Sequence, residues 1–290
     1  GGSERDGGYL RNELTDIFLE LERELQLPDP KIVLRVNRNI PQDLLNSGLR
    51  CMMTGTGSPL LSNDDIIIPA LMDFGVEDTD AYDYATSACW EPLIGGRSSS
   101  MNNVARLSYM KALDNLLLEE RLGRFQNFDM LKSCYFQYLK REIRRVKRQL
   151  YERRYRKNTL YSVFMEGCRE SGKDIVEGGA KYHNIGITTI ALGNTVNALL
   201  NIQRYVFEER QFDLVDVKKI SLFNYEGYEE VAGILRTNEA QYGCDSDEVI
   251  SLSNELLRFV SKETEDFRLP DGGRLKFGSS SPSFIMEGSS

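Results

Sequence analysis

Apolar residues recur every three or four positions through much of the chain, which is the spacing of a helix with one buried face. This pattern predicts helices at residues 10–25, 41–47, 66–74, 104–118, 193–209, 214–222, 228–236 and 247–267, and one long or broken helix at residues 128–161. A continuous apolar run at residues 31–36 predicts a strand covered on both faces. Residues 177–189 are expected to enter the core as a strand or loop, and residues 275–285 to form one more strand and then a loop. Strands alternating with long helical segments predict an α/β barrel or part of one.

Glycine, proline and aspartate mark the connections between these elements. Residues 55–59 contain two glycines and a proline and are expected to form a loop. Residues 95–100 are also rich in glycine and serine, but they lack the order of a phosphate-binding loop. We expect them to form a flexible wall of the functional cavity. Asp64 and Asp65 are expected to cap the helix that starts at Ile66.

Composition narrows the class of protein. The chain has 290 residues, 41% of them hydrophobic, so residues 1–290 are assigned to one domain with a sizeable core. No apolar run could span a bilayer and the first residues do not resemble a signal peptide, which predicts a cytoplasmic protein that does not enter membranes. The formal charge of −8 argues against nucleic-acid binding. Five scattered cysteines without a CxxC spacing predict neither disulfides nor a zinc site.

The candidate chemistry lies in the hexapeptide Ser87-Ala88-Cys89-Trp90-Glu91-Pro92. In an extended segment, residues two apart point to the same side, so Cys89 and Glu91 are expected to face one cavity and Trp90 the opposite side. Pro92 prevents a helix from starting here. A nearby carboxylate and the loss of water both keep a thiol protonated, which argues against a thiolate nucleophile. A neutral thiol that gives up a hydrogen atom, beside a carboxylate that moves a proton, fits the pair better.

The order Cys-x-Glu-Pro, preceded by residues 55–65 and followed by Gly95-Gly96-Arg97, resembles the glycyl radical enzymes, in particular their dehydratases, eliminases and decarboxylases. The resemblance implies part of a ten-stranded α/β barrel with long helical insertions. It also implies that Cys89 becomes a transient thiyl radical and that Glu91 is the general base of a lyase. Two adjacent cysteines, as in the pyruvate formate-lyases proper, are absent because Trp90 follows Cys89.

Substrate-binding residues are implied in the same way. Met101 and Asn103 lie at the distance after the cysteine where relatives place polar side chains that contact substrate, and Arg97 could hold an anionic group. Asn103 stands where some polyol dehydratases have an aspartate. This difference argues against a diol substrate bound by a carboxylate at this position. His183, the one histidine, is expected to bond backbone groups rather than to act as a base.

The resemblance covers the whole of this chain, but the chain corresponds only to the middle part of the sequences of family members. The N-terminal helical region and the C-terminal domain with its Arg-Val-Ser/Ala-Gly-Tyr motif are not found in these residues, and Glu226-Gly227-Tyr228 lacks the preceding Arg-Val. The radical glycine is therefore expected to be missing, and the chain alone inactive, whether it is a fragment, a truncated reading frame or one piece of a split enzyme. No bound metal or cofactor is expected. The implied partners are a small-molecule substrate, a radical-SAM activating enzyme and a complementing chain with the glycyl radical domain, and the full-length form is expected to be a homodimer.

A basic stretch at residues 140–157 leaves other functions open. A basic helix can bind nucleic acid, an acidic lipid surface or an acidic partner. The favoured interpretation is a solvated face with Ile143, Val146 and Leu150 packed inward, because the net charge is negative and no aromatic row accompanies the basic residues. The alternatives to a catalytic core are a non-catalytic remnant or interaction module, and a nucleic-acid binder that uses this helix.

Overall fold

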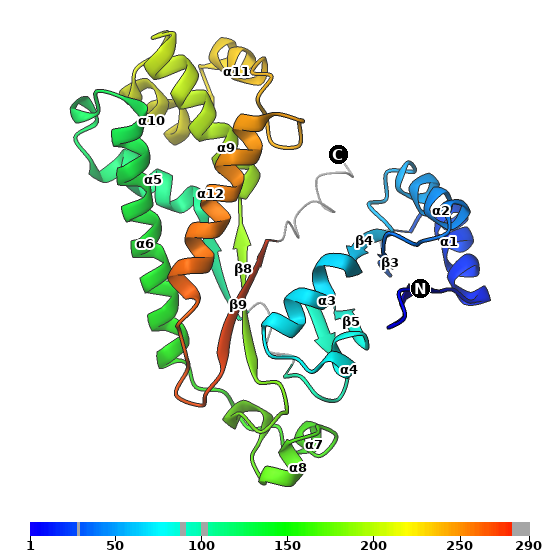
Figure 1. Ribbon diagram of the computed structural model, residues 1–290. Coiled ribbons are helices and arrows are strands. Elements are labelled where there is room, and N and C mark those ends of the chain that lie inside the picture. Colours follow the sequence, from blue (N-terminus) through cyan, green and yellow to red (C-terminus); the bar gives the residue numbers. More distant parts are fainter. Residues whose placement is uncertain (28–29, 88–90, 100–103, 280–290) are drawn as a thin grey trace.

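The computed structural model describes residues 1–27, 30–87, 91–99 and 104–279 (Figure 1). Its helices are α1 (Glu13–Leu25), α2 (Gln42–Met52), α3 (Asp64–Asp73), α4 (Asp78–Ala81), α5 (Tyr109–Glu119), α6 (Phe128–Glu152), α7 (Thr159–Ser162), α8 (Cys168–Ser171), α9 (Leu192–Asn201), α10 (Leu214–Leu222), α11 (Glu229–Arg236) and α12 (Asp247–Thr264). Its strands are β1 (Gly2–Ser3), β2 (Tyr9–Leu10), β3 (Val33–Val36), β4 (Leu60–Asn63), β5 (Tyr84–Ser87), β6 (Glu91–Ile94), β7 (Ala105–Ser108), β8 (Asn184–Ile190) and β9 (Arg274–Ser279). A π-helical segment at Ile202–Glu208 prolongs α9.

The fold is mixed α/β, as predicted, and its longer strands run parallel. β3 pairs with β4, and β8 lies between β7 and β9, all in parallel. β5 and β6 form an antiparallel hairpin, and β1 and β2 a short antiparallel pair. These are four separate sheets, so the barrel is not closed within the residues that the structure describes.

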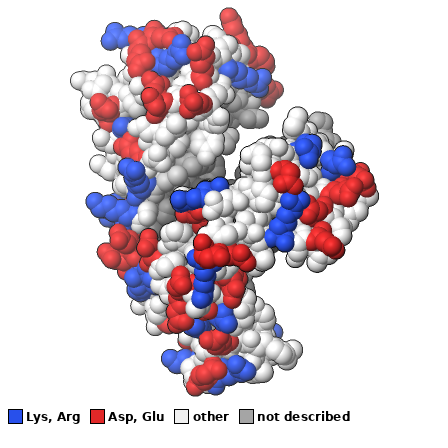
Figure 2. Space-filling view, turned by 45° about the vertical axis from the view of Figure 1, so that its right-hand side comes forward, with Lys and Arg blue, Asp and Glu red and all other residues white. Residues whose placement is uncertain are grey.

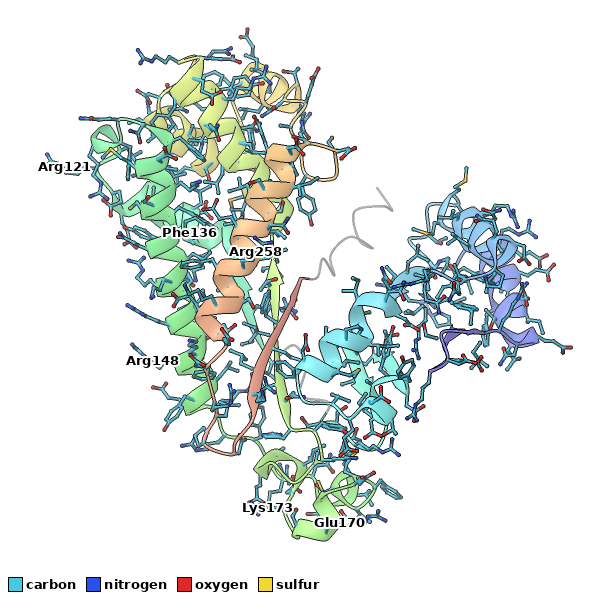
Figure 3. The ribbon with its side chains drawn as sticks, in the orientation of Figure 1. Arg121, Phe136, Arg148, Glu170, Lys173 and Arg258 are labelled. Carbon is cyan, nitrogen blue, oxygen red and sulfur yellow. The ribbon has the colours of Figure 1, made fainter. Side chains whose placement is uncertain are left out.

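Helices cover one face of the β7–β8–β9 sheet and form the main core with it (Figure 1). The sheet contributes Leu107, Ile185 and Leu275, each buried. The covering helices α5, α6, α9 and α12 contribute many of the other buried side chains, among them Leu116, Leu139, Ile143, Leu199, Leu256 and Val260. Between α6 and α12, Phe136 and Arg258 line a shared surface groove (Figure 3). Burial of apolar surface therefore joins these helices to the sheet.

The helix predicted for residues 104–118 is in part a strand. Residues 105–108 form β7, and α5 starts only at Tyr109, with the Ser108 side chain accepting a hydrogen bond from the Lys111 amide as its N-cap. Leu107 fits the helical spacing of the segment, but it packs into the core from the sheet. Periodicity alone could not separate a short buried strand from the first turn of a helix.

The N-terminal region packs less completely. The apolar stripe predicted at residues 10–25 lies on α1, but much of it is exposed, including Leu14 at 59% and Phe18 at 52%. Leu19 is the residue that turns inward, where it packs with Leu44 and Cys51 of α2. Within the described chain, α1 thus presents an apolar face to solvent beside a groove of about 510 Å³ that it shares with β3.

The basic stretch forms the second half of α6 and packs as favoured from the sequence. Ile143, Val146 and Leu150 are all buried against the core. Several of the basic side chains pair with carboxylates, Lys140 with Glu263 of α12, Arg141 with Glu119 of α5, and Arg145 with Glu142 of α6 itself. Figure 2 shows basic and acidic side chains interspersed over the visible face rather than separated by sign. Of the two forms predicted for residues 128–161, one long or one broken helix, the structure has the broken one: α6 ends at Glu152 and α7 begins at Thr159.

Among the described helices, none is long and apolar enough to cross a membrane.

Candidate active site

The β5–β6 hairpin carries the predicted hexapeptide. Ser87 ends β5 and Glu91 begins β6, and the two residues are paired across the strands. Residues 88–90 connect them in sequence and lie outside the described residues. The predicted orientations of Cys89 and Trp90 therefore stay predictions, as do the roles of Met101 and Asn103, which also lie outside the described residues.

Glu91 is the described member of the predicted catalytic pair. Its side chain is partly buried, and its Oε2 atom lies 3.4 Å from the Ser87 hydroxyl, which can donate to it. Proline has no backbone N–H and cannot donate a hydrogen bond to a neighbouring strand. Pro92 is tolerated in β6 because β6 is an edge strand, with β5 as its described partner. The carboxylate is thus held at the end of a two-stranded hairpin, directly after the segment that contains Cys89.

Lys276 is the residue near this carboxylate that sequence reasoning missed. It lies on β9, is partly buried, and its Nζ atom donates a hydrogen bond of 3.4 Å to the carbonyl of Pro92. Burial lowers the pKa of the Lys276 ammonium, while attraction to the Glu91 carboxylate opposes that shift. The signal available in the sequence was the alternation Arg274-Leu275-Lys276-Phe277, which places two cations on one face of a strand.

A buried ionic cluster around Asp64 holds the start of β5, at the end of the hairpin opposite Ser87 and Glu91. Asp64 is not the helix cap that the sequence suggested, because Asn63 takes that position and accepts from the Asp65 amide. The fully buried Asp64 carboxylate instead receives two hydrogen bonds from Arg35, both of 2.9 Å, and one of 2.5 Å from the Tyr84 hydroxyl. Burial would raise the pKa of this carboxyl, but the Arg35 and Tyr84 contacts outweigh it and lower the pKa.

A second cluster, around Asp80, holds the chain where it leaves β6, at the same end of the hairpin. Arg97 follows β6, and its guanidinium lies 2.8 Å from Asp80 and 2.9 Å from Glu166. Asp80 also accepts hydrogen bonds from Lys181 at 3.0 Å and from the Tyr182 hydroxyl at 2.7 Å. Burial opposes ionisation of Asp80, but Tyr182, Lys181 and Arg97 together lower its pKa. In this structure Arg97 binds carboxylates of its own chain, and its predicted contact with a substrate anion stays a prediction.

The described part of the glycine- and serine-rich segment after β6 is bonded to the chain that enters β8, and the flexible wall expected there stays a prediction. Ser98 forms a parallel bridge with Tyr182. The Ser99 side chain is buried, and its hydroxyl donates to the Asn184 carbonyl at 3.0 Å. These bonds align residues 97–99 beside the chain entering β8, so the hairpin exit is fixed to the central sheet.

His183 lies next to the same segment. Its Nε2 atom is 3.0 Å from a carboxylate oxygen of Asp271, and its backbone carbonyl accepts from the Arg274 amide at 3.3 Å. The side chain is 8% exposed and faces the turn before β9. The expected bonds to backbone groups are made by its main chain, whereas its ring faces a carboxylate.

Comparison with known proteins places this architecture in a family. The chain is 24% identical over 298 residues to a (2S)-3-sulfopropanediol dehydratase of Klebsiella oxytoca, which covers 96% of this chain and 36% of that protein. The B12-independent glycerol dehydratase of Clostridium butyricum superposes with a TM-score of 0.79 at 23% identity, over 96% of this chain and 37% of that one. A glycyl radical enzyme of Archaeoglobus fulgidus superposes with a TM-score of 0.74 at 24% identity, over 96% and 38%.

The Klebsiella and Clostridium relatives are named as dehydratases, and other relatives as sulfite-lyases and a decarboxylase glycyl radical subunit. The chain spans little more than a third of the length of the relatives that it matches. Their solved structures share its arrangement of strands and helices, which is part of the glycyl radical enzyme barrel. The family model for "Pyruvate formate lyase-like" proteins matches residues 1–286, and this chain therefore belongs to the pyruvate formate lyase-like family of glycyl radical enzymes.

Proposed function

We propose that this chain is the catalytic-core portion of a glycyl radical lyase, dehydratase or decarboxylase that acts on a small organic substrate. The observation that carries the proposal is the β5–β6 hairpin. It places Glu91 directly after the Cys89 segment, and two charge clusters hold its open end, where the chain enters β5 and leaves β6. A rigid hairpin suits a reaction in which a hydrogen atom and a proton leave neighbouring positions of one substrate.

In the proposed reaction, the Cys89 sulfur takes a hydrogen atom from the substrate carbon that bears a hydroxyl, so an S–H bond forms as a C–H bond breaks. The glycyl radical supplies the unpaired electron that makes the sulfur reactive. Glu91 accepts the hydroxyl proton as general base. The leaving group on the next carbon departs with the electron pair of its bond, and the product radical takes the hydrogen atom back from the thiol.

Met101 and Asn103 are proposed as substrate contacts, with Arg97 as a residue that could hold an anionic group. This assignment rests on their sequence positions after Cys89. For Arg97 the described contacts set a condition, because a substrate anion would have to share the guanidinium with Asp80 and Glu166.

We also propose that polypeptide carrying the radical glycine completes the site, and that a radical-SAM enzyme installs the radical. The solved relatives have more than half of their length outside the region that matches this chain. The exposed apolar face of α1 and the groove beside it support further polypeptide at this end, since parallel strands such as β3 are normally covered on both faces. The completed enzyme is proposed to be a homodimer.

The test is electron paramagnetic resonance after anaerobic activation. The chain is mixed with a polypeptide that contains the glycyl radical domain of a relative, a radical-SAM activating enzyme and S-adenosylmethionine. The expected result is a glycyl doublet that decays when substrate candidates are added, with product formed. Glu91→Gln should keep the doublet and lose turnover by about 100-fold or more, the size of a general-base contribution.

The control is Glu248→Gln, an exposed glutamate in the first turn of α12, which should leave turnover unchanged. A doublet that forms without any turnover, for every candidate polyol, sulfonate and carboxylate, would leave the chain as a non-catalytic interaction module. Full activity of a Cys89→Ala variant would overturn the proposed role of Cys89.

A further inference from the structure

Two cations project from one face of β9 toward the unit formed by α3 and the β5–β6 hairpin. Arg274 donates to the carbonyl of Phe74 and lies 4.3 Å above its ring. Lys276, two residues on, donates to the carbonyl of Pro92. Leu275 between them is buried in the helix-covered core. The alternation of a strand therefore gives β9 one apolar face toward the helices and one basic face toward the candidate site.

Lys276 has few charged groups near it other than Glu91. Its neighbour across the sheet is Gly186 of β8, which has no side chain to fill the space. Arg274 on the same face is directed to Phe74. Within the described chain, Glu91 is the charged group whose attraction acts on the Lys276 ammonium, and both side chains are partly buried. Attraction between unlike charges strengthens as water is removed.

We propose that Lys276 is a positioning residue for Glu91. Its hydrogen bond to Pro92 fixes the start of β6 on the central sheet, and its positive charge balances the carboxylate. This inference rests on the proposed role of Glu91 as general base. It also adds a preference about the substrate. When Glu91 accepts a proton, the charge of Lys276 is no longer balanced, and a positive charge beside the reacting carbons favours a leaving group that departs as an anion.

The first experiment measures the coupling directly and needs no radical. Protein labelled with ¹³C-lysine is titrated while the Lys276 Cε signal, assigned by its loss in Lys276→Arg, is followed by NMR. In Glu91→Gln the titration midpoint of Lys276 should fall by about half a pH unit or more, because the attraction that opposed the effect of burial is gone. Glu248→Gln, on the surface of α12, is the matched control and should leave the midpoint in place.

The second experiment tests the positioning. Hydrogen exchange of the β6 amides should become several-fold faster in Lys276→Met and return toward the wild-type rate in Lys276→Arg, which keeps the charge and a donor. An unchanged Lys276 midpoint in Glu91→Gln overturns the proposal, and so does equal protection of β6 in the methionine and arginine variants. A chain that gives no radical can still show the coupling, so failure of the proposed function and failure of this inference are distinguishable.

Discussion

The helix-covered sheet and the β5–β6 hairpin are stabilised in different ways. Around β7, β8 and β9 most buried residues are apolar and belong to one large cluster, with Thr188, Thr189 and Glu142 among the buried polar ones. Around the hairpin the apolar cluster is small, and the contacts where the chain enters β5 and leaves β6 centre on the buried carboxylates of Asp64 and Asp80. Apolar burial tolerates small shifts of side chains, whereas a charged cluster requires defined geometry. The region proposed to hold the reacting groups is thus the one whose contacts are directional.

The largest expected effect is on the hairpin side. Asp64→Asn removes the charge that pairs with Arg35 and leaves a buried guanidinium without its partner, which typically costs about 3–5 kcal/mol. Hydrogen exchange should accelerate in β3, β5 and β6, while the central part of α6 stays protected. The matched control is Asp65→Asn, at the next position, whose carboxylate is partly exposed. Equal loss of protection in α6 would mean that the two regions unfold as one unit.

The next largest effect is expected from a substitution in the apolar core. Leu139→Ala on α6 removes a fully buried side chain and should lower the free energy of unfolding of the helical region by about 2–5 kcal/mol. Chemical denaturation followed by far-ultraviolet circular dichroism reports this change, because most helices lie in that region. Exchange of the β5 and β6 amides should change less than that of α5 and α12. A uniform effect over both regions would contradict the distinction.

Lowering the pH should destabilise the hairpin region before the helix-covered core, without any mutation. The carboxyl pKa values of Asp64 and Asp80 are lowered in the folded chain, so their contribution to stability is complete above the unfolded value near about 4 and is lost as pH falls through the folded values. Exchange protection in β5 and β6, corrected for the intrinsic pH dependence of exchange, should fall below about pH 4. The core side of α6, built from apolar residues, should keep its protection over the same range. Loss of α6 protection first would contradict this.

The smallest effect is expected on the surface of α6. Arg141→Gln breaks an ion pair with Glu119 in which both side chains are about half exposed. Water and salt screen such a pair, so the denaturation midpoint should shift by no more than the error of the measurement. Lys140→Gln, which breaks the pair with Glu263, serves as a second surface variant and should behave in the same way. A large loss of stability would show that the basic face is part of the core contacts.

Much of the fold could be predicted from periodicity, because long helices repeat their apolar spacing many times. The inward stripe Ile143, Val146 and Leu150 was predicted and is confirmed. The strand β7 was missed, because its four residues carry too few apolar positions to separate the two periods.

The site could be predicted only where its residues are neighbours in sequence. Glu91 lies two positions from Cys89 and was identified with it, although its role stays a prediction. Lys276 reaches the same place from the other end of the chain, through the pairing of β9 with β8. Asp64 was taken for a helix cap because sequence shows its neighbour Ile66, not the distant Arg35 that pairs with it. Contacts between remote segments depend on topology, which one sequence without an alignment does not reveal.

The parallel arrangement of β7, β8 and β9 has a consequence for biosynthesis. Ala105 pairs with Ile187, and Ile185 pairs with Leu275, so each pairing closes a long intervening segment. Local helices such as α6 can form while the chain is still emerging from the ribosome, but this sheet is completed only after β9 has been translated. Until then, the partly assembled strands and the apolar faces of their helices are open to chaperones and to misassembly. The basic face of β9 reaches Glu91 at that same late step, so the surroundings of this carboxylate are assembled only after β9 has docked.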